Sequence, residues 1–212
     1  MLNSIVFQTM LNNSKIIIAS TNQGKVKEIK DFLNLGEQIV DLSFIENLKN
    51  EKAPEVDENA LTYIDNALLK AKAIFNWSGG SNTILSDDSG LEVEALNGAP
   101  GIHSARYAGA NLPFQANIDK LFYELQGKEN RKAKMVSNII FLKTLNEHKV
   151  FTGEIYGTII DDPMGNGGFG FDPIFFIDEV GKTLSEIKEQ RIPFLTHRQR
   201  ALQAMLNQIS FK

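Results

Sequence analysis

The stretch "IIIASTNQGKVKEIKDFL", residues 16–33, predicts a buried strand, a short polar turn and an amphipathic helix in direct succession. Three β-branched isoleucines bounded by polar residues are typical of a buried strand, which we expect over residues 15–20. Apolar residues then recur at steps of three and four with lysines between them, which predicts a helix over residues 24–35. We expect this helix to end at Gly36, because glycine readily adopts the left-handed conformation found at helix ends.

The turn of this stretch, "STNQGK" at residues 20–25, raises the question of a phosphate site. It matches neither the P-loop pattern nor the glycine pattern of dinucleotide-binding folds. Backbone N–H groups at a helix N-terminus nevertheless favour an anion, and Lys25 would add a full positive charge. The alternative is an ordinary strand–turn–helix with a surface lysine, and the stretch alone leaves both interpretations open.

Further along the chain, the spacing of apolar residues alternates between strand-like and helix-like segments. A long helix is predicted to end at Gly79-Gly80. Its inward face would be formed by apolar residues three and four positions apart, namely Leu61, Ile64, Leu68, Ala71 and Phe75. The other predicted segments are strands at 38–42, 83–85, 91–96, 134–142, 150–160 and 174–177, and helices at 113–127 and 196–209. This mixture of strands and helices predicts an α/β or α+β fold.

The composition indicates a globular protein whose 212 residues suit one domain or a two-lobed one. Lys and Arg number 22 against 26 Asp and Glu, and the net charge of −4 argues against duplex nucleic acid as a partner. The absence of cysteine excludes disulfides, thiolate metal sites and a cysteine nucleophile, and it fits a reducing compartment. No apolar run approaches the roughly 18 residues of a membrane span. Residues 1–14 lack the features of a signal peptide, so we interpret them as an extension before the first strand.

Two adjacent aspartates, Asp87 and Asp88, follow the strand predicted at 83–85, in the sequence "LSDDSG". Successive strand residues point to opposite faces, so the two carboxylates are expected to have different roles. One carboxylate can face a cleft while the other stabilises the turn. A carboxylate at a strand end suits Mg²⁺, which prefers oxygen ligands. The alternative is an aspartate-rich turn that binds nothing.

A second acidic cluster, formed by Glu55, Asp57 and Glu58, precedes the long helix. A carboxylate from this cluster could share a metal with the aspartate pair if the helix packs near that strand. The alternative is a solvated acidic loop, since acidic residues favour helix N-termini.

Two further segments have groups suited to a base or a phosphate. In "GGFGFDP", residues 167–173, glycines allow close approach of the backbone, and Phe169 or Phe171 could stack on a flat base. The alternative is a turn with core aromatic residues. In "THRQR", residues 196–200, His197 and Arg198 are donors at a helix start that could bind a carbonyl oxygen or a phosphate. The alternative is a surface pair, and the sequence does not show whether all these groups converge.

Taken together, these segments resemble the inosine/xanthosine triphosphate pyrophosphatases, also called the Ham1-like family. The similarity extends from residue 15 to about residue 208, in the order found in the family, and its longest block surrounds Asp88. The matching segments are STNQGKVKEI (20–29), ALTYIDNALLKA (60–71), SDDSGLEVEALNGAPGIHSARYAG (86–109), GGFGFDPIFF (167–176), GKTLSEI (181–187) and THRQRAL (196–202).

The resemblance implies hydrolysis of ITP, dITP and XTP to the monophosphate and pyrophosphate with Mg²⁺. It implies one domain over residues 15–212, with an elongated, mixed α/β fold of two lobes, a central cleft and a homodimeric assembly. The partner would be a small-molecule nucleoside triphosphate, without nucleic-acid or membrane partners, and we expect a cytoplasmic protein.

The resemblance also implies roles for individual residues. Asp88 would be the general base and a metal ligand, with Lys25 and Lys70 as the catalytic cations. The second metal ligand would be Glu58, with Asp57 as the reserve. The residues expected to bind substrate are Ser20, Thr21, Asn22, Gln23, Gly24, Lys25, Ser89, Phe169, Gly170, Phe171, Asp172, Arg191, His197 and Arg198.

Three positions differ from the usual pattern of the family. Thr196 stands where serine is usual and keeps the hydroxyl, whereas Phe171 stands where tyrosine is usual and lacks it. Ile192 occupies the position of a substrate-binding lysine, so either Arg191 takes this role with a shift of one residue or the contact is lost. Two alternatives therefore stay open: a pyrophosphatase with a different preferred base, and a relative that binds nucleotides without hydrolysing them.

Overall fold

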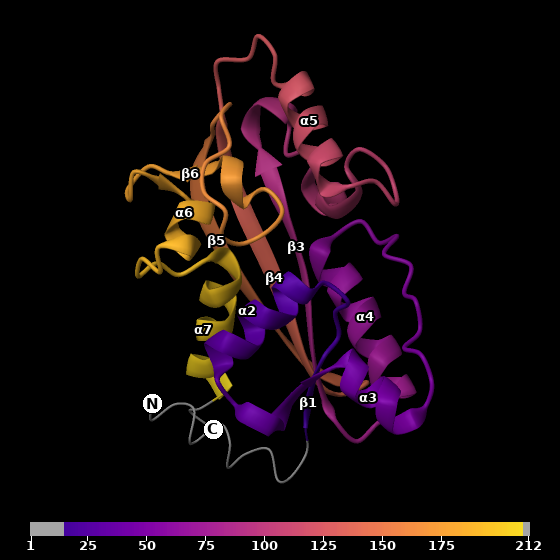
Figure 1. Ribbon diagram of the computed structural model, residues 1–212. Coiled ribbons are helices and arrows are strands. Elements are labelled where there is room, and N and C mark those ends of the chain that lie inside the picture. Colours follow the sequence, from indigo (N-terminus) through magenta and orange to yellow (C-terminus); the bar gives the residue numbers. More distant parts are fainter. Residues whose placement is uncertain (1–14, 210–212) are drawn as a thin grey trace. The chain divides into compact units, whose positions relative to one another are not determined.

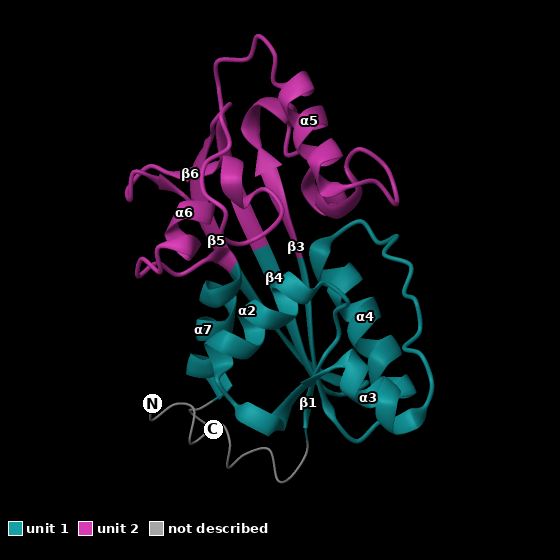
Figure 2. Cartoon of the chain, in the orientation of Figure 1, with its two compact units in different colours: residues 1–88, 137–153, 198–212 teal, residues 89–136, 154–197 magenta. Residues whose placement is uncertain are grey.

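The computed structural model describes residues 15–209, so the extension expected over residues 1–14 lies outside the described part. The chain divides into two compact units, which Figure 2 distinguishes by colour. Of the described residues, unit 1 comprises 15–88, 137–153 and 198–209, and unit 2 comprises 89–136 and 154–197. The single domain expected over residues 15–212 stays a prediction.

Seven strands form one mixed sheet (Figure 1). They are β1 (Ile16–Ile18), β2 (Ile39–Asp41), β3 (Thr83–Val93), β4 (Lys132–Thr144), β5 (Glu147–Ile159), β6 (Phe175–Ile177) and β7 (Lys182–Thr183). Their order in the sheet is β2-β1-β3-β4-β5-β6-β7. β1 is parallel to β2 and β3, whereas β6 is antiparallel to β5 and β7. The predicted mixed α/β class is therefore confirmed.

Helices connect most of these strands. The α-helices of the described residues are α2 (Gln23–Leu33), α3 (Leu42–Lys49), α4 (Tyr63–Trp77), α5 (Phe114–Glu124), α6 (Leu184–Glu189) and α7 (His197–Ile209). Short 3₁₀ helices cover Gly36–Gln38, Glu94–Leu96, Gly101–Arg106 and Asp172–Ile174. None of the helices within residues 15–209 has the length and apolar character that crossing a bilayer requires.

Unit 1 buries both faces of β1, which explains the unbroken run of isoleucines. Ile16 and Ile18 pack with apolar residues of α2 and α7, whereas Ile17 packs with residues of α3 and α4. Figure 1 shows α2 and α7 on one side of β1 and α3 and α4 on the other. A parallel strand covered on both faces is expected to be continuously apolar. Complete burial of each isoleucine contributes roughly 1.5–3 kcal/mol to folding.

Unit 2 has its own apolar core, to which α5, α6 and β6 contribute. Leu121 of α5, Leu184 of α6 and Phe175 of β6 are fully buried within it. Phe171 belongs to the same cluster, and its ring meets that of Phe114 edge-on with 4.9 Å between the centroids. The core of unit 2 therefore includes an aromatic residue from the loop that was expected to hold the base.

The predicted bounds of α2 and β3 are wrong. Helix α2 ends at Leu33 rather than near Gly36, because Asn34 adopts the left-handed conformation with φ 47° and caps the helix. The strands predicted at 83–85 and 91–96 are one continuous strand, β3. The polar residues between them resemble a turn in the sequence, but two of them, Asp87 and Asp88, are buried within the strand.

The inward face of α4 also differs from the prediction. The helix begins only at Tyr63, after the cap residue Thr62, so Leu61 lies outside it and is 89% exposed. Ile64 is likewise exposed. The buried residues of α4 are Asn66, Ala67, Ala71, Ile74 and Phe75. Helices α3 and α6 are absent from the predicted elements because each is too short for a clear periodic pattern.

Candidate active site

The turn between β1 and α2 contains the first group of predicted site residues. Asn22 is the N-cap of α2, and its Oδ1 accepts a hydrogen bond from Lys25 N at 3.1 Å. Ser20 Oγ accepts a hydrogen bond from Asn22 N at 3.2 Å and so stabilises the turn. In this segment Thr21, Asn22 and Gln23 are exposed, and Ser20, Gly24 and Lys25 are half-buried. The turn is therefore an ordered helix start whose polar groups can be reached from solvent.

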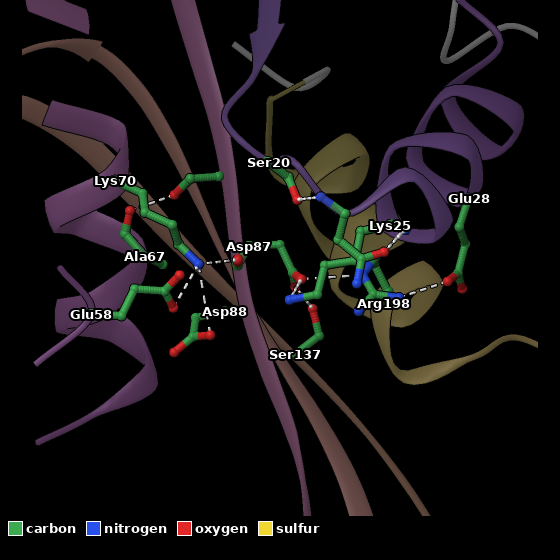
Figure 3. Close-up of polar contacts among 12 residues, drawn as sticks. Ser20, Lys25, Glu28, Glu58, Ala67, Lys70, Asp87, Asp88, Ser137 and Arg198 are labelled. Atoms are coloured by element: carbon green, nitrogen blue, oxygen red, sulfur yellow. Dashed lines mark hydrogen bonds and ion pairs between the residues drawn. The ribbon is translucent and has the colours of Figure 1, made fainter. Parts of the chain in front are cut away.

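Asp87 and Asp88 point to opposite faces of β3, as the alternation along a strand predicts (Figure 3). Asp87 is directed toward α2 and α7, and Asp88 toward α4. The preceding residues follow the same alternation, since Leu85 packs with α2 and α7 whereas Ile84 packs with α4. The strand thereby gives two adjacent carboxylates different surroundings.

Asp87 is the centre of a buried network of charges. Its Oδ2 lies 2.8 Å from Lys25 Nζ and 3.3 Å from Arg198 Nε, and Ser137 Oγ donates a hydrogen bond to its Oδ1 at 2.5 Å. Desolvation raises the pKa of the Asp87 carboxyl, but the Arg198 and Lys25 charges outweigh it and hold this pKa well below its usual range. Asp87 is therefore ionised and forms ion pairs with two cations.

Arg198 is held between two carboxylates and is 1% exposed. Its NH1 lies 2.6 Å from Glu28 Oε2, while its Nε faces Asp87. Burial lowers the pKa of the guanidinium, but Asp87 and Glu28 outweigh this effect and raise it above its usual value. Arg198 thus has a structural role in unit 1, and its contact with a purine stays a prediction.

Lys25 is the more accessible cation of this network, with 15% of its side chain exposed. Desolvation lowers the pKa of its ammonium group, and the carboxylate of Asp87 opposes that shift. The side chain is therefore oriented by a counter-ion at the start of α2. A phosphate bound at this helix N-terminus would meet a lysine whose position is already fixed.

On the other face of β3, Lys70 Nζ joins the two carboxylates that were predicted to share a metal. It lies 3.1 Å from Glu58 Oε2 and 3.7 Å from Asp88 Oδ1, and it donates a hydrogen bond to Asp87 O at 2.9 Å. Figure 3 shows Glu58 and Asp88 approaching this ammonium group together. Asp57, the reserve ligand, is exposed and is hydrogen-bonded to Asn59 Nδ2 at 3.4 Å. The geometry favours Glu58 as the second carboxylate.

The surroundings of Asp88 suit a proton acceptor. Desolvation raises the pKa of its carboxyl to about 6, with Lys70 and Lys25 opposing the shift and Glu58 adding to it. A base whose pKa lies near the working pH is efficient, because it is ionised yet still takes up a proton.

Glu58 and Asp88 also fit Mg²⁺, since both carboxylates converge on a position that already holds a positive charge. Mg²⁺ commonly takes one or two carboxylates together with waters and substrate phosphates. Within residues 15–209, no cluster of three or more His, Asp or Glu side chains is arranged around one metal position. A bound Mg²⁺ would therefore need ligands from water and substrate.

The other predicted residues belong to unit 2. Phe169 is half-buried, whereas Phe171 is 5% exposed and packs in the core. Asp172 is buried, and its Oδ2 accepts hydrogen bonds from Phe169 N and Lys188 Nζ, each at 2.8 Å. Phe171 and Asp172 therefore support the loop from within, and Phe169 and Gly170 are the more accessible members of the predicted base-binding set.

Ser89, Arg191 and His197 complete the predicted set in unit 2. Ser89 is half-buried, His197 is buried, and Arg191 is exposed with a left-handed backbone at φ 54°. The structure thus brings the residues from Ser20 to Lys25, together with Glu58, Lys70, Asp88 and Arg198, into unit 1. Joint action of the two groups stays a prediction.

Three residues with clear roles are absent from the predicted set: Glu28, Ser137 and Lys188. Glu28 follows Lys25 by three positions on α2, but its partner is Arg198 of α7, so the spacing along the helix did not point to its role. Ser137 is a hydroxyl inside the apolar run of β4, where a buried polar group needs a partner. Lys188 lies on α6, which was not predicted, so no pattern pointed to it.

The chain is similar to known proteins over most of its length. Residues 16–208 match the model of the Ham1 family. The chain is 40% identical over 192 residues to a dITP/XTP pyrophosphatase of Exiguobacterium sp. strain AT1b, covering 90% of this chain and 94% of that protein. It resembles the solved structure of the Staphylococcus aureus Ham1 protein with a TM-score of 0.79 and 36% identity, covering 93% of this chain and 99% of that one. It also resembles a HAM1 protein from Coxiella burnetii with a TM-score of 0.81 and 29% identity, covering 94% and 100%.

Proposed function

Because the chain belongs to the Ham1 family, we propose that it hydrolyses the purine triphosphates dITP, XTP and ITP to the monophosphate and pyrophosphate. The observation that carries the proposal is the arrangement of Lys25, Lys70, Glu58 and Asp88 around β3. The proposal is further supported by relatives named dITP/XTP pyrophosphatase that match most of the chain.

The triphosphate is bound by the start of α2 and by the two lysines. N–H groups at the helix start favour an anion, and Lys25 and Lys70 supply positive charge on the two faces of β3. Negative charge grows on the phosphate oxygens as the anhydride bond breaks. Cations that are already oriented stabilise this charge without further reorganisation.

Asp88 accepts the proton of the attacking water. The water oxygen forms a bond to phosphorus at the α–β anhydride, the bridging P–O bond breaks, and pyrophosphate leaves. The carboxyl pKa of about 6 makes Asp88 ionised at neutral pH and still able to hold the proton. Asp87 cannot replace it, because its carboxylate is enclosed by Lys25, Arg198 and Ser137.

Glu58 and Asp88 are the residues that would hold Mg²⁺, with water and phosphate oxygens as the other ligands. When bound, Mg²⁺ neutralises phosphate charge and orients the pyrophosphate leaving group. Lys70 lies between the two carboxylates and keeps them close together before substrate arrives.

Selection of the base rests on hydrogen-bond donors directed at the purine 6-position. Hypoxanthine and xanthine have a 6-oxo acceptor there, whereas adenine has a 6-amino donor. We propose His197 and Arg198 as sources of donors and the loop around Phe169 as the surface against the ring. A donor facing another donor in a buried site costs about 1–3 kcal/mol, which disfavours ATP.

Two finer proposals concern assembly and location. The resemblance to the family supports a homodimer, and the absence of cysteine fits a cytoplasmic protein. A nucleotide-binding protein without hydrolysis is a second candidate, favoured only by the exposed Arg191 at the place where a substrate-binding cation was expected.

The test is pyrophosphate release from dITP, XTP, ITP, GTP and ATP, with Mg²⁺ and with a chelator. We expect rapid release from dITP, XTP and ITP, little from ATP, and loss of release without Mg²⁺. Asp88→Asn should lose nearly all turnover while staying folded. Asp31→Asn, at an exposed carboxylate of α2, is the matched control and should keep full activity. Tight binding of dITP by wild-type protein without any release would favour the second candidate.

A further inference from the structure

The glycine-rich loop, defined as residues 165–171, lies with its backbone against α6. Ser185 Oγ donates a hydrogen bond to Gly167 O at 2.6 Å, and Asn166 N donates one to Glu189 Oε2 at 3.2 Å. A Cβ at Gly167 would lie 2.5 Å from Ser185 O and 2.6 Å from Glu189 N. The loop therefore has no room for a side chain at this position, and α6 fixes its path.

Asp172 follows this loop directly, and its carboxylate links the loop backbone to α6. Its Oδ2 accepts one hydrogen bond from Phe169 N and another from Lys188 Nζ. Gly168 has φ 76°, and a Cβ there would lie 2.0 Å from the same carboxylate oxygen. Asp172 is 3% exposed, so its pairing with Lys188 is shielded from solvent. Charge-assisted hydrogen bonds are stronger in such a buried setting than in water.

Lys188 has a second contact within the loop. Its Nζ lies 5.2 Å from the centroid of the Phe169 ring, which is within the range of a cation–π interaction. The same ammonium group therefore holds Phe169 twice, through Asp172 at the backbone and directly at the ring. Only 19% of the Lys188 side chain is exposed, so its position is restricted.

We infer that Lys188 is a positioning residue that sets the orientation of the Phe169 ring for contact with the purine. The inference rests on the proposed function, in which Phe169 contacts a base. Arg191, the cation expected in this region from the sequence, is exposed. Within residues 15–209 its side chain forms no hydrogen bond or ion pair, whereas Lys188 is held against the ring.

The first experiment compares steady-state kinetics with dITP and Mg²⁺ for wild type, Lys188→Met and Lys188→Arg. We expect Lys188→Met to raise KM roughly 5- to 30-fold. Its kcat should change less than about two-fold, because the proposed phosphate contacts and the proposed base belong to other residues. Lys188→Arg keeps a cation over the ring of Phe169, so its KM for dITP should return close to the wild-type value. Lys182→Met removes a neighbouring lysine, paired with Glu186 at 3.7 Å, and should behave like wild type.

Inorganic tripolyphosphate separates positioning of the base contact from general damage, because it has phosphates and no base. Its inhibition constant should be the same for wild type and Lys188→Met. An equal rise in the dITP KM and in this inhibition constant would overturn the inference, because Lys188 would then act on the whole site. An unchanged KM for Lys188→Met would also overturn it.

A spectroscopic readout does not depend on turnover. In a Trp77→Phe background, Phe169→Trp places the sole indole of the chain at the ring position. Adding Lys188→Met should shift the emission maximum and lower the anisotropy of this indole, and identical spectra would contradict the positioning role. If wild type releases no pyrophosphate from dITP, XTP or ITP, the proposed function fails, while this comparison still decides whether Lys188 orients the side chain at position 169.

Discussion

Replacing Asp87 with asparagine removes one negative charge from a buried network and leaves its shape nearly unchanged. In the native protein, Asp87 and Glu28 balance Lys25 and Arg198, so these four side chains have no net charge. Asp87→Asn leaves one positive charge without compensation. Removing one partner of a buried ion pair typically costs about 3–5 kcal/mol. We expect a loss of about 3 kcal/mol in the free energy of unfolding, at the lower end because Glu28 still contacts Arg198.

Urea denaturation followed by circular dichroism measures this loss. Asp31→Asn is the control, because Asp31 pairs with Lys27 at the surface and their side chains are 65% and 77% exposed. We expect this control to change stability by less than about 1 kcal/mol. A loss below about 1 kcal/mol for Asp87→Asn as well would refute the reasoning that the buried charges depend on one another.

A second variant tests the same reasoning in the opposite direction. Lys25→Met in the Asp87→Asn background restores a network without net charge. The double variant should therefore be more stable than the sum of the two single losses predicts, by about 1–3 kcal/mol. Additive losses would mean that Asp87 supports the fold through its shape and its hydrogen bond with Ser137 rather than through charge.

Three further predictions concern elements outside the site. Desolvation raises the pKa of Asp41, but hydrogen bonds from Lys30 and others lower it to about 2. Its stabilisation should therefore be complete above about pH 4 and lost between about pH 4 and 2, where wild type and Asp41→Asn should converge in chemical denaturation. A Cβ at Gly157 would lie 2.2 Å from Phe176 O, so Gly157→Ala should cost at least about 1–3 kcal/mol in thermal unfolding. Thr183 caps α6 in a capping box, so Thr183→Ala should cost about 1 kcal/mol whereas Thr183→Ser should be nearly neutral in the same assay.

Local sequence patterns were sufficient to predict those helices and strands whose apolar residues have one dominant spacing. The isoleucines of β1 and the residues of α7 around Leu202 and Met205 are predicted correctly because burial follows their periodicity. The prediction was wrong at β3, where Asp87 and Asp88 are polar in sequence but buried in the strand. Their partners lie on other elements, so the local sequence does not show that these charges are compensated.

In the candidate site, too, local patterns predicted some features, whereas others depend on residues far apart in the sequence. Alternation along a strand correctly separates the two aspartates, and the acidic cluster before α4 correctly includes a carboxylate close to Asp88. The counter-ions could not be predicted, because Glu28 and Arg198 meet only when α2 and α7 pack on the same face of the sheet. For Phe171 the sequence left base stacking and a place in the core both open, because its burial depends on Phe114 of α5.

The pairing of β3 with β1 has a consequence for the role proposed for Asp88. Thr83 lies opposite Ile16 and Leu85 opposite Ile18, and this alignment determines the face of every later residue in the strand. A slip by one residue would turn Asp87 toward α4 and enclose Asp88 among the buried cations. The chain would then contain the same two carboxylates, yet the one beside Lys70 would be the other aspartate. Which of two chemically identical side chains lies beside Lys70, where the proposed base is located, is thus decided by strand alignment and not by residue type.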